Sequence, residues 1–200
     1  MSSGVARIQA NTEAAVARNG LTREARFEIE ALPHLDAITR TAARVTGNRA
    51  HAEDLAQETF MQAWRSFDRF ETGTNCRAWL FKILFNVIRH DRRQLFNFNL
   101  RSFRRQTDEE MPEPELVYEP PVPPHLTDED VLAALDRVPV SYREVVVLAD
   151  VEEFAYREIA EMLDIPVGTV MSRLSRGRAR LRNELATFAA GYGITAAAQS

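Results

Sequence analysis

Apolar residues recur every three or four positions along most of this chain, which is the period of one face of an α-helix. The pattern predicts an amphipathic helix over Leu32–Val45, with Leu35 and Ile38 on its apolar face, and a second helix over His51–Phe67. Residues 47–49 separate the two as a turn. No segment shows the strict alternation that is typical of a half-buried strand.

A third helix is predicted after a short polar loop. Phe70–Asn75 contains Gly73 and small polar residues, which are typical of a loop. Thr74 or Asn75 caps the helix that follows. The apolar face of this helix consists of Trp79, Leu80, Ile83, Leu84, Val87 and Ile88.

Prolines and acidic residues interrupt the helical pattern between Asp108 and Thr127, which predicts an extended linker. Helices resume at Thr127, an expected N-cap with acidic residues in the first turn. Ser141 is expected to cap the next helix in a capping box with Glu144. Val145–Leu148 is β-branched, but it lies within a helical period and is interpreted as buried helix.

The last part of the chain has the pattern of a helix-turn-helix. Ala155–Leu163 forms one short helix, Asp164–Pro166 breaks it, and a second helix starts near Val167. The apolar positions of the second helix fall on one face: Val170, Leu174, Leu181 and Leu185.

These elements predict an all-α protein with two small helical domains joined by an acidic, Pro-rich linker, the second domain holding the helix-turn-helix. The expected divisions are a flexible N-terminal tail (1–22), the first domain (23–97), the linker (98–126), the second domain (127–187) and a C-terminal tail (188–200).

The charges are segregated along the chain. The net charge is −4, with 27% charged and 45% hydrophobic residues, which is typical of a globular protein. Arginines nevertheless cluster in Arg89–Arg105 and Arg173–Arg182, while Asp108–Asp130 is acidic. Two basic patches separated by an acidic spacer are compatible with a nucleic-acid partner despite the negative average.

Several classes of function lack support in the sequence. Cys76 is the only cysteine and the four histidines lie far apart, so we expect no metal site and no cofactor. Nothing suggests a nucleophile with a base, so we expect no catalytic residue. No apolar run approaches the roughly 20 residues of a membrane span, and the N-terminal residues lack a secretory pattern. We therefore expect a cytoplasmic protein without membrane insertion.

The arginine-rich helix is a candidate DNA reader. The face opposite its apolar stripe presents Thr169, Ser172, Arg173, Arg176 and Arg180. Arginine pairs bidentately with guanine edges or binds phosphates. The alternative is a solvated arginine face on an ordinary helical hairpin, but the turn and the uneven charge favour DNA.

Two further groups lie in the first domain. Asp54, Gln57 and Glu58 are three and four residues apart and share a helix surface, which taken alone is more often a solvated acidic face. Aromatic residues alternate with Arg and Lys between Trp64 and Asn86, a composition suited to single-stranded DNA. The alternative is that the aromatic residues are core.

Three segments carry a family resemblance: Ala52–Phe60, Arg77–Leu80 and Ile165–Arg178. Together they resemble bacterial sigma factors of the extracytoplasmic-function (ECF) group of the sigma-70 family, in the family's order and spacing. The resemblance covers about Glu28 to Leu185. It implies a sigma factor that binds core RNA polymerase, directs it to the −35 and −10 promoter elements and helps to open the DNA.

The resemblance also implies roles for residues and partners. Asp54, Gln57 and Glu58 would dock the β′ clamp helices of the polymerase, and the second domain would touch the β flap. The implied −10 contacts are Phe67, Arg69, Asn75, Arg77, Lys82, Asn86, Arg89, Arg92 and Arg93. The implied −35 contacts are Thr169, Ser172, Arg173, Arg176, Arg178 and Arg180. An anti-sigma factor is an expected partner by resemblance.

The sequence departs from the family at two places. His51 stands where many members have Asp, and Gln94–Phe98 replaces a basic stretch that some members carry. Two other functions stay open from the residues alone. One is a stand-alone helix-turn-helix regulator with an N-terminal ligand or partner domain, and the other is an enzyme that acts on nucleic acid.

Overall fold

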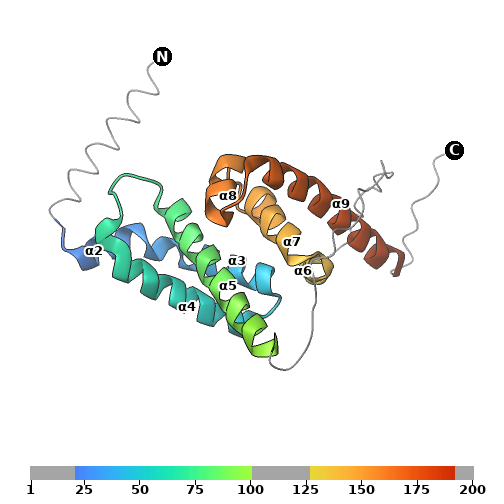
Figure 1. The fold of residues 1–200 in the computed structure, drawn as a ribbon, viewed down its shortest axis with the longest axis horizontal. Helices are drawn as coiled ribbons and strands as arrows, with labels where there is room; N and C mark the ends of the chain where they lie inside the picture. The colour runs from blue at the N-terminus through green and yellow to red at the C-terminus, as the bar shows by residue number, and fades with distance from the viewer. Residues whose placement is uncertain (1–20, 101–126, 192–200) are drawn as a thin grey trace, which may run out of the picture.

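The computed structural model describes residues 21–100 and 127–191, and within these ranges every regular element is a helix (Figure 1). The first domain runs from α2 to α5 and the second from α6 to α9. The predicted tails up to residue 20 and from residue 192, and the predicted linker over residues 101–126, lie outside the described residues.

The first domain contains α2 (Arg23–Glu30), η1 (Leu32–His34), α3 (Leu35–Thr46), α4 (Arg49–Ser66), η2 (Phe67–Arg69) and α5 (Cys76–Leu100). Each boundary has a local cause. Gly47 ends α3 in the left-handed region at φ 69°, and the Asn48 side chain accepts from the His51 amide at the start of α4. The Asn75 side chain accepts from the Ala78 amide, so Asn75 is confirmed as the cap of α5.

The core of the first domain is aromatic and aliphatic. Its largest fully buried side chains are Ile38, Phe67, Leu80, Phe81, Leu84, Phe85 and Ile88. Each stabilises the fold by about 1.5–3 kcal/mol relative to an exposed position. Leu35 was expected on the buried face but is exposed, because helical geometry begins at this residue and the preceding three form the tighter turn η1.

The second domain contains α6 (Asp128–Arg137), α7 (Val140–Val146), the π-helical turn η3 (Val147–Val151), α8 (Tyr156–Leu163) and α9 (Val167–Gly191). Thr127 caps α6 through a reciprocal capping box with Asp130, as predicted. The Ser141 cap is wrong: α7 begins at Val140 after Pro139, whose fixed φ suits a helix start, and no side chain caps it. Val145–Leu148 is buried helix, as predicted.

The boundaries between domains and linker differ slightly from expectation. Helix α5 reaches Leu100, three residues into the range given to the linker, and α9 reaches Gly191, beyond the expected end of the domain at residue 187. Both helices therefore end later in the chain than the sequence predicted.

The two domains pack against each other along α3 and α5 (Figure 1). Helix α8 lies on α5, and α6 and α7 lie on α3. The Phe81 and Phe154 rings meet at 4.9 Å between centroids, and Arg143 Nη1 donates to the Val45 carbonyl at 3.2 Å. One continuous apolar core thus spans both domains.

Candidate nucleic-acid interfaces

The helix-turn-helix is formed by α8, a short turn and α9. Asp164 ends α8 in the left-handed region at φ 56°, and the amides of Thr169 and Val170 donate to the Pro166 carbonyl to start α9. Val170 and Leu174 are buried, as predicted. Close packing of α9 on α7 depends on Gly177, because an added Cβ there would lie 2.6 Å from Val146 Cγ2.

The residues expected to read the −35 element differ in how exposed they are. Ser172 and Arg180 are exposed, and Thr169, Arg173 and Arg176 are half-buried. Arg173, Arg176 and Arg180 follow one another by three and four residues and share one face of α9. Glu184 Oε1 lies 3.3 Å from Arg180 Nε, and the Arg180 side chain stays exposed despite this ion pair.

Arg178 lies on the other side of α9. It donates to both oxygens of Asp150, at 3.0 and 2.5 Å, and this hydrogen-bonded pair raises the pKa of the Arg178 guanidinium. The contact ties α9 to η3. The structure therefore separates Arg178 from the arginine stripe with which the sequence grouped it.

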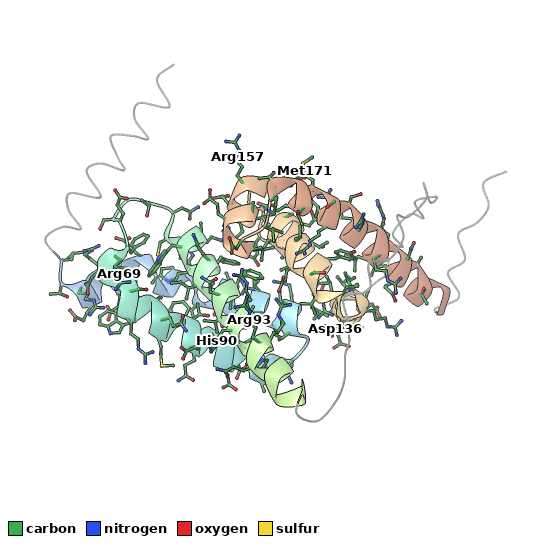
Figure 2. All side chains as sticks on the ribbon, viewed as in Figure 1. Arg69, His90, Arg93, Asp136, Arg157 and Met171 are labelled. Carbon is green, nitrogen blue, oxygen red and sulfur yellow. The ribbon has the colours of Figure 1, made fainter. Side chains whose placement is uncertain are left out.

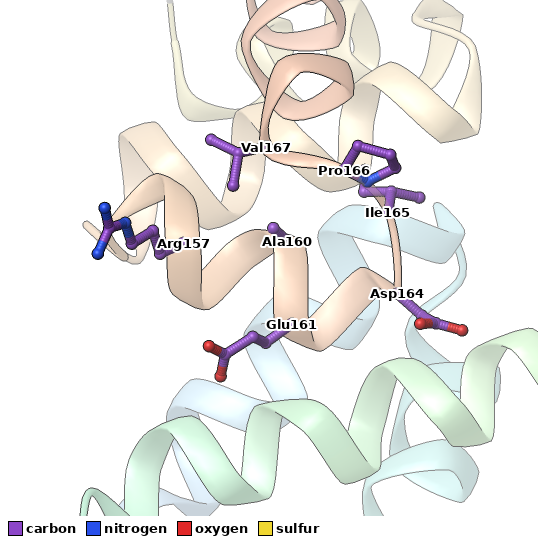
Figure 3. A pocket seen from close by; sticks show the side chains of 7 residues that line it. All are labelled: Arg157, Ala160, Glu161, Asp164, Ile165, Pro166 and Val167. Carbon is purple, nitrogen blue, oxygen red and sulfur yellow. The ribbon is translucent and has the colours of Figure 1, made fainter.

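The outer side of the helix-turn-helix is mixed in chemistry. Arg157 of α8 and Met171 of α9 project together away from the first domain (Figure 2). Beside them lies an open hollow of about 550 Å³ between α8 and the start of α9 (Figure 3). One arginine and two carboxylates, Glu161 and Asp164, line it, so its net charge does not favour phosphate.

The acidic surface predicted for polymerase docking lies on α4. Asp54 and Gln57 are exposed, and Glu58 is half-buried and accepts from Gln62 Nε2 at 2.9 Å. The opposite face of α4 is buried in the core, as its pattern predicts. The three side chains thus share one solvent-facing surface of a rigid helix.

The loop between η2 and α5 rests on an aromatic platform. The Phe67 and Phe70 rings stack with centroids 5.7 Å apart, and Trp79 packs against both. Phe67 is 1% exposed and cannot contact DNA directly, so the structure gives it a supporting position rather than the expected contact. The tip, with Gly73 at φ 92° and Asn75, is exposed.

Helix α2 braces this loop, which the sequence analysis missed. Arg26 Nη2 donates to Thr72 Oγ1 at 2.5 Å. Arg23 stacks over the Trp64 ring at 4.2 Å, donates to the Trp64 carbonyl and lies 3.1 Å from Asp68. The sequence does contain two arginines one helical turn apart. Their partners lie about 40 residues further along the chain, so no local pattern indicated the contact.

The −10 candidates on α5 fall on two faces. Lys82, Asn86 and Arg93 recur by helical spacing and are exposed, as is Arg69 before the loop. The second face points toward the other domain. There Arg77 and Arg92 form ion pairs with Glu152 and Glu144, each at 2.6 Å. Arg89 Nη2, at the edge of the exposed face, donates to the Leu163 carbonyl at 2.9 Å.

Glu144 lies where arginines of both domains converge. Burial raises the pKa of its carboxyl, while the charges of Arg92, Arg173 and Arg89 act in the opposite direction. Loss of water around this carboxylate therefore outweighs the attraction of its three cationic neighbours.

The described residues contain no group of three or more side chains that could hold a metal ion. Burial, with a smaller contribution from Glu30, raises the pKa of the Cys76 thiol to about 12, so this thiol stays protonated at neutral pH. Within the same residues no helix is long and apolar enough to span a membrane.

A helix-turn-helix and a second basic helical surface on one chain define a DNA-binding protein. Residues 32–95 match the sequence profile of Sigma-70 region 2, and residues 128–181 match that of Sigma-70, region 4. Among relatives, the chain is 37% identical over 156 residues to the ECF RNA polymerase sigma factor SigE of Mycolicibacterium smegmatis. That alignment covers 76% of this chain and 59% of SigE.

Two further relatives are covered over most of their length. EcfG of Rhodopseudomonas palustris is 36% identical over 155 residues, covering 76% of this chain and 80% of EcfG. SigW of Bacillus subtilis is 33% identical over 161 residues, covering 75% and 83%. The chain therefore belongs to the ECF sigma factors of the sigma-70 family, which serve in promoter recognition and transcription initiation, and the family prediction is confirmed.

Solved structures agree with this assignment. The sigma factor RpoE from Bartonella quintana, solved with the anti-sigma factor NepR, superposes with a TM-score of 0.65 at 32% identity, covering 80% of this chain and 96% of RpoE. CnrH, solved with the cytosolic domain of CnrY, shares the fold with a TM-score of 0.58 at 24% identity, covering 88% and 97%.

Proposed function

We propose that this sigma factor contacts core RNA polymerase and both promoter elements through three separate surfaces. The first is the acidic face of α4, the second is the loop with the exposed face of α5, and the third is the arginine stripe of α9. The observation that carries the proposal is that each surface presents exposed or half-buried polar side chains within the residues that match region 2 or region 4.

The α4 face would dock the β′ clamp helices of the polymerase. Asp54 and Gln57 are exposed on a helix that is anchored by its opposite side, so their geometry is fixed before binding. Such preorganisation limits the entropy lost on association. The second domain would add a contact to the β flap.

The loop and α5 would open the −10 element. A base flipped out of the duplex costs a few kcal/mol of stacking, which a protein pocket must replace. The loop begins at Phe70, whose ring stacks on the buried Phe67, and Arg26 donates to Thr72 within it, so a flipped base would meet an anchored loop. Lys82, Asn86 and Arg93 would follow the backbone of the separated strand.

The arginine stripe of α9 would read the −35 element in the major groove. Arg173, Arg176 and Arg180, with Ser172 and Thr169, present guanidinium and hydroxyl groups along one side of the helix. Bidentate pairing of an arginine with guanine contributes about 1–3 kcal/mol of discrimination.

We also propose an anti-sigma factor as a partner, supported by the likeness to RpoE, which was solved with NepR. A partner of this kind would compete with polymerase for the surfaces described above.

The docking surface is tested by Asp54→Arg in the full chain, with Asp36→Arg as the control. Both carboxylates are exposed in the first domain, and Asp36 lies on α3 outside the proposed surface. Asp54→Arg is expected to weaken binding to core polymerase at least about tenfold, the equivalent of 1.4 kcal/mol. Unchanged affinity, or an equal loss in the control, would refute the assignment.

A further inference from the structure

The outward side of α9 carries an apolar residue among its most exposed positions. In the first turns of the helix the exposed side chains include Met171, Ser172 and Ser175, whereas Arg173 and Arg176 are half-buried. Met171 is 56% exposed, more than any other large apolar side chain that the structure describes. The part of α9 that a partner meets first therefore includes a long apolar side chain.

Met171 lies on the flank of α9 that the arginine stripe leaves free. Successive residues of an α-helix are about 100° apart around its axis. Ser172 therefore points away from the buried Val170 and Leu174. Met171 lies to one side of Ser172, and the arginine stripe lies to the other. The two flanks of the same helix thus differ in chemistry, one cationic and one apolar.

The apolar flank begins one turn earlier and is open to the outside. Val167, the first residue of α9, is 39% exposed and lies one turn before Met171. A Cβ added at Gly168, between them in the chain, would meet nothing within 4 Å. Met171 projects away from the first domain, as Arg157 does (Figure 2). The flank is therefore accessible to a molecule as large as a DNA duplex.

Thymine alone among the four bases presents an apolar group in the major groove. This group is its C5-methyl, and the other bases offer hydrogen-bond donors and acceptors there. An apolar side chain placed against such polar edges displaces water without replacing its hydrogen bonds, which is unfavourable. Against a methyl group the same side chain gains from burial. A methionine also adapts well to an irregular surface, because its side chain is flexible and its sulfur polarisable.

The position of Met171 along α9 suits a base contact. The N-terminal residues of a recognition helix are those that contact base edges in the major groove. Helix α9 begins at Val167, so Met171 lies in its second turn, beside Ser172.

We propose that Met171 is a specificity-determining residue, which selects thymine in the −35 element through an apolar contact with the thymine C5-methyl group. Val167 borders this contact. The inference rests on the function proposed above, in which α9 reads the −35 element. The arginine stripe supplies hydrogen bonds to guanine or phosphates, and the opposite flank recognises a group that forms no hydrogen bond.

The size of the effect follows from the burial of one methyl group. Such a group contributes about fourfold in affinity, since about 0.8 kcal/mol corresponds to that ratio at 1.4 kcal/mol per factor of ten. Uracil differs from thymine only by the missing methyl group. Replacing the contacted thymine by uracil is therefore expected to weaken binding about fourfold.

The test uses the full chain bound to core RNA polymerase. Selection from a duplex pool randomised over about 12 base pairs, slightly more than one turn of DNA, gives the preferred −35 sequence. Each thymine of the selected duplex, on either strand, is then replaced in turn by uracil. Fluorescence anisotropy measures the affinity for each duplex, and the readout is the ratio of the thymine affinity to the uracil affinity.

Met171→Ala is the test variant and Met61→Ala is the matched control. Alanine favours helix, and Met171 is exposed, so the substitution is expected to keep the fold, which circular dichroism verifies. Met61 is 41% exposed but lies on α4 in the first domain. We expect a ratio of about four at one thymine in the unchanged protein and in Met61→Ala, and a ratio of about one in Met171→Ala.

The outcomes separate this inference from the proposed function. A protein that selects no sequence from the pool refutes the −35 assignment itself. A protein that selects a sequence but binds its uracil forms equally well refutes only the role of Met171. The same holds if the selected sequence has no A·T pair, if the ratio persists in Met171→Ala, or if Met61→Ala loses it to the same extent.

Discussion

Gly177 determines how closely the recognition helix α9 approaches α7. A Cβ at this position would lie 2.6 Å from Val146 Cγ2, 3.2 Å from the Tyr142 carbonyl oxygen and 3.3 Å from Tyr142 Cβ. Val146 is buried and β-branched, so it has one strongly preferred rotamer in a helix. The Tyr142 oxygen belongs to the backbone. Neither neighbour moves away without shifting a helix.

Gly177→Ala therefore has two opposing effects. Alanine favours helix over glycine by about 1 kcal/mol. Overpacking of a close contact costs about 1–3 kcal/mol, and the 2.6 Å approach places this site at the upper end. The net expectation is a destabilisation of about 1–2 kcal/mol. In a chain of this size that corresponds to a melting temperature lower by about 2–8 °C.

Thermal unfolding followed by circular dichroism measures the change, with Gly168→Ala as the control. Gly168 is on the same helix, and a Cβ there meets nothing within 4 Å, so its substitution is expected to be neutral or stabilising. In a Val146→Ala background the penalty of Gly177→Ala should shrink, because the closest contact is gone. A Gly177→Ala protein as stable as the Gly168→Ala protein would refute this reasoning.

Three further outcomes are expected. Arg176→Ala should weaken binding to a −35 duplex in a mobility-shift assay, whereas Arg178→Ala, whose guanidinium is paired with Asp150, should change it less than about twofold; equal losses would contradict the division of the arginines. Arg26→Ala should reduce promoter opening, detected by permanganate reactivity, while leaving binding to core polymerase unchanged, because both contacts that it loses, the bond to Thr72 and the cation–π contact with Phe67, lie at the loop; opening at the normal level would exclude a bracing role. Burial raises the pKa of Glu144 above its ordinary 4.5, so the stability this group contributes is full below that value and is lost as pH rises through the raised pKa. Glu144→Gln should flatten the dependence of melting temperature on pH in that window, and an unchanged profile would show that another group titrates there.

The sequence predicted the fold class and most helices because their signals are local. Thr127 and Asn75 cap helices as expected, since an N-cap needs only the next three residues. The Ser141 cap was wrong because Pro139, two residues earlier, offered an equally local helix start. Phe67 failed as a DNA contact because periodicity does not distinguish an aromatic residue below a loop from one on its surface.

The packing of one domain on the other could not be predicted in the same way. Arg77 and Glu152 are 75 residues apart, and Arg92 and Glu144 are 52 apart, so no window of sequence contains either pair. The sequence pattern predicted Glu144 as the capping-box partner of Ser141 and gave Glu152 no role. Only the three-dimensional arrangement shows that they are buried against arginines of the first domain.

This packing also bears on how a chain with a net charge of −4 can serve as a DNA-binding protein. Affinity for DNA depends on the cations that reach phosphates, and each contact adds to the release of counterions. In this structure Arg77 and Arg92 pair with buried carboxylates of the second domain, although Arg92 stays exposed, as Lys82 and Arg93 are. A chain in this state presents fewer cations to the large excess of non-promoter DNA in a cell, where non-specific binding is almost wholly electrostatic.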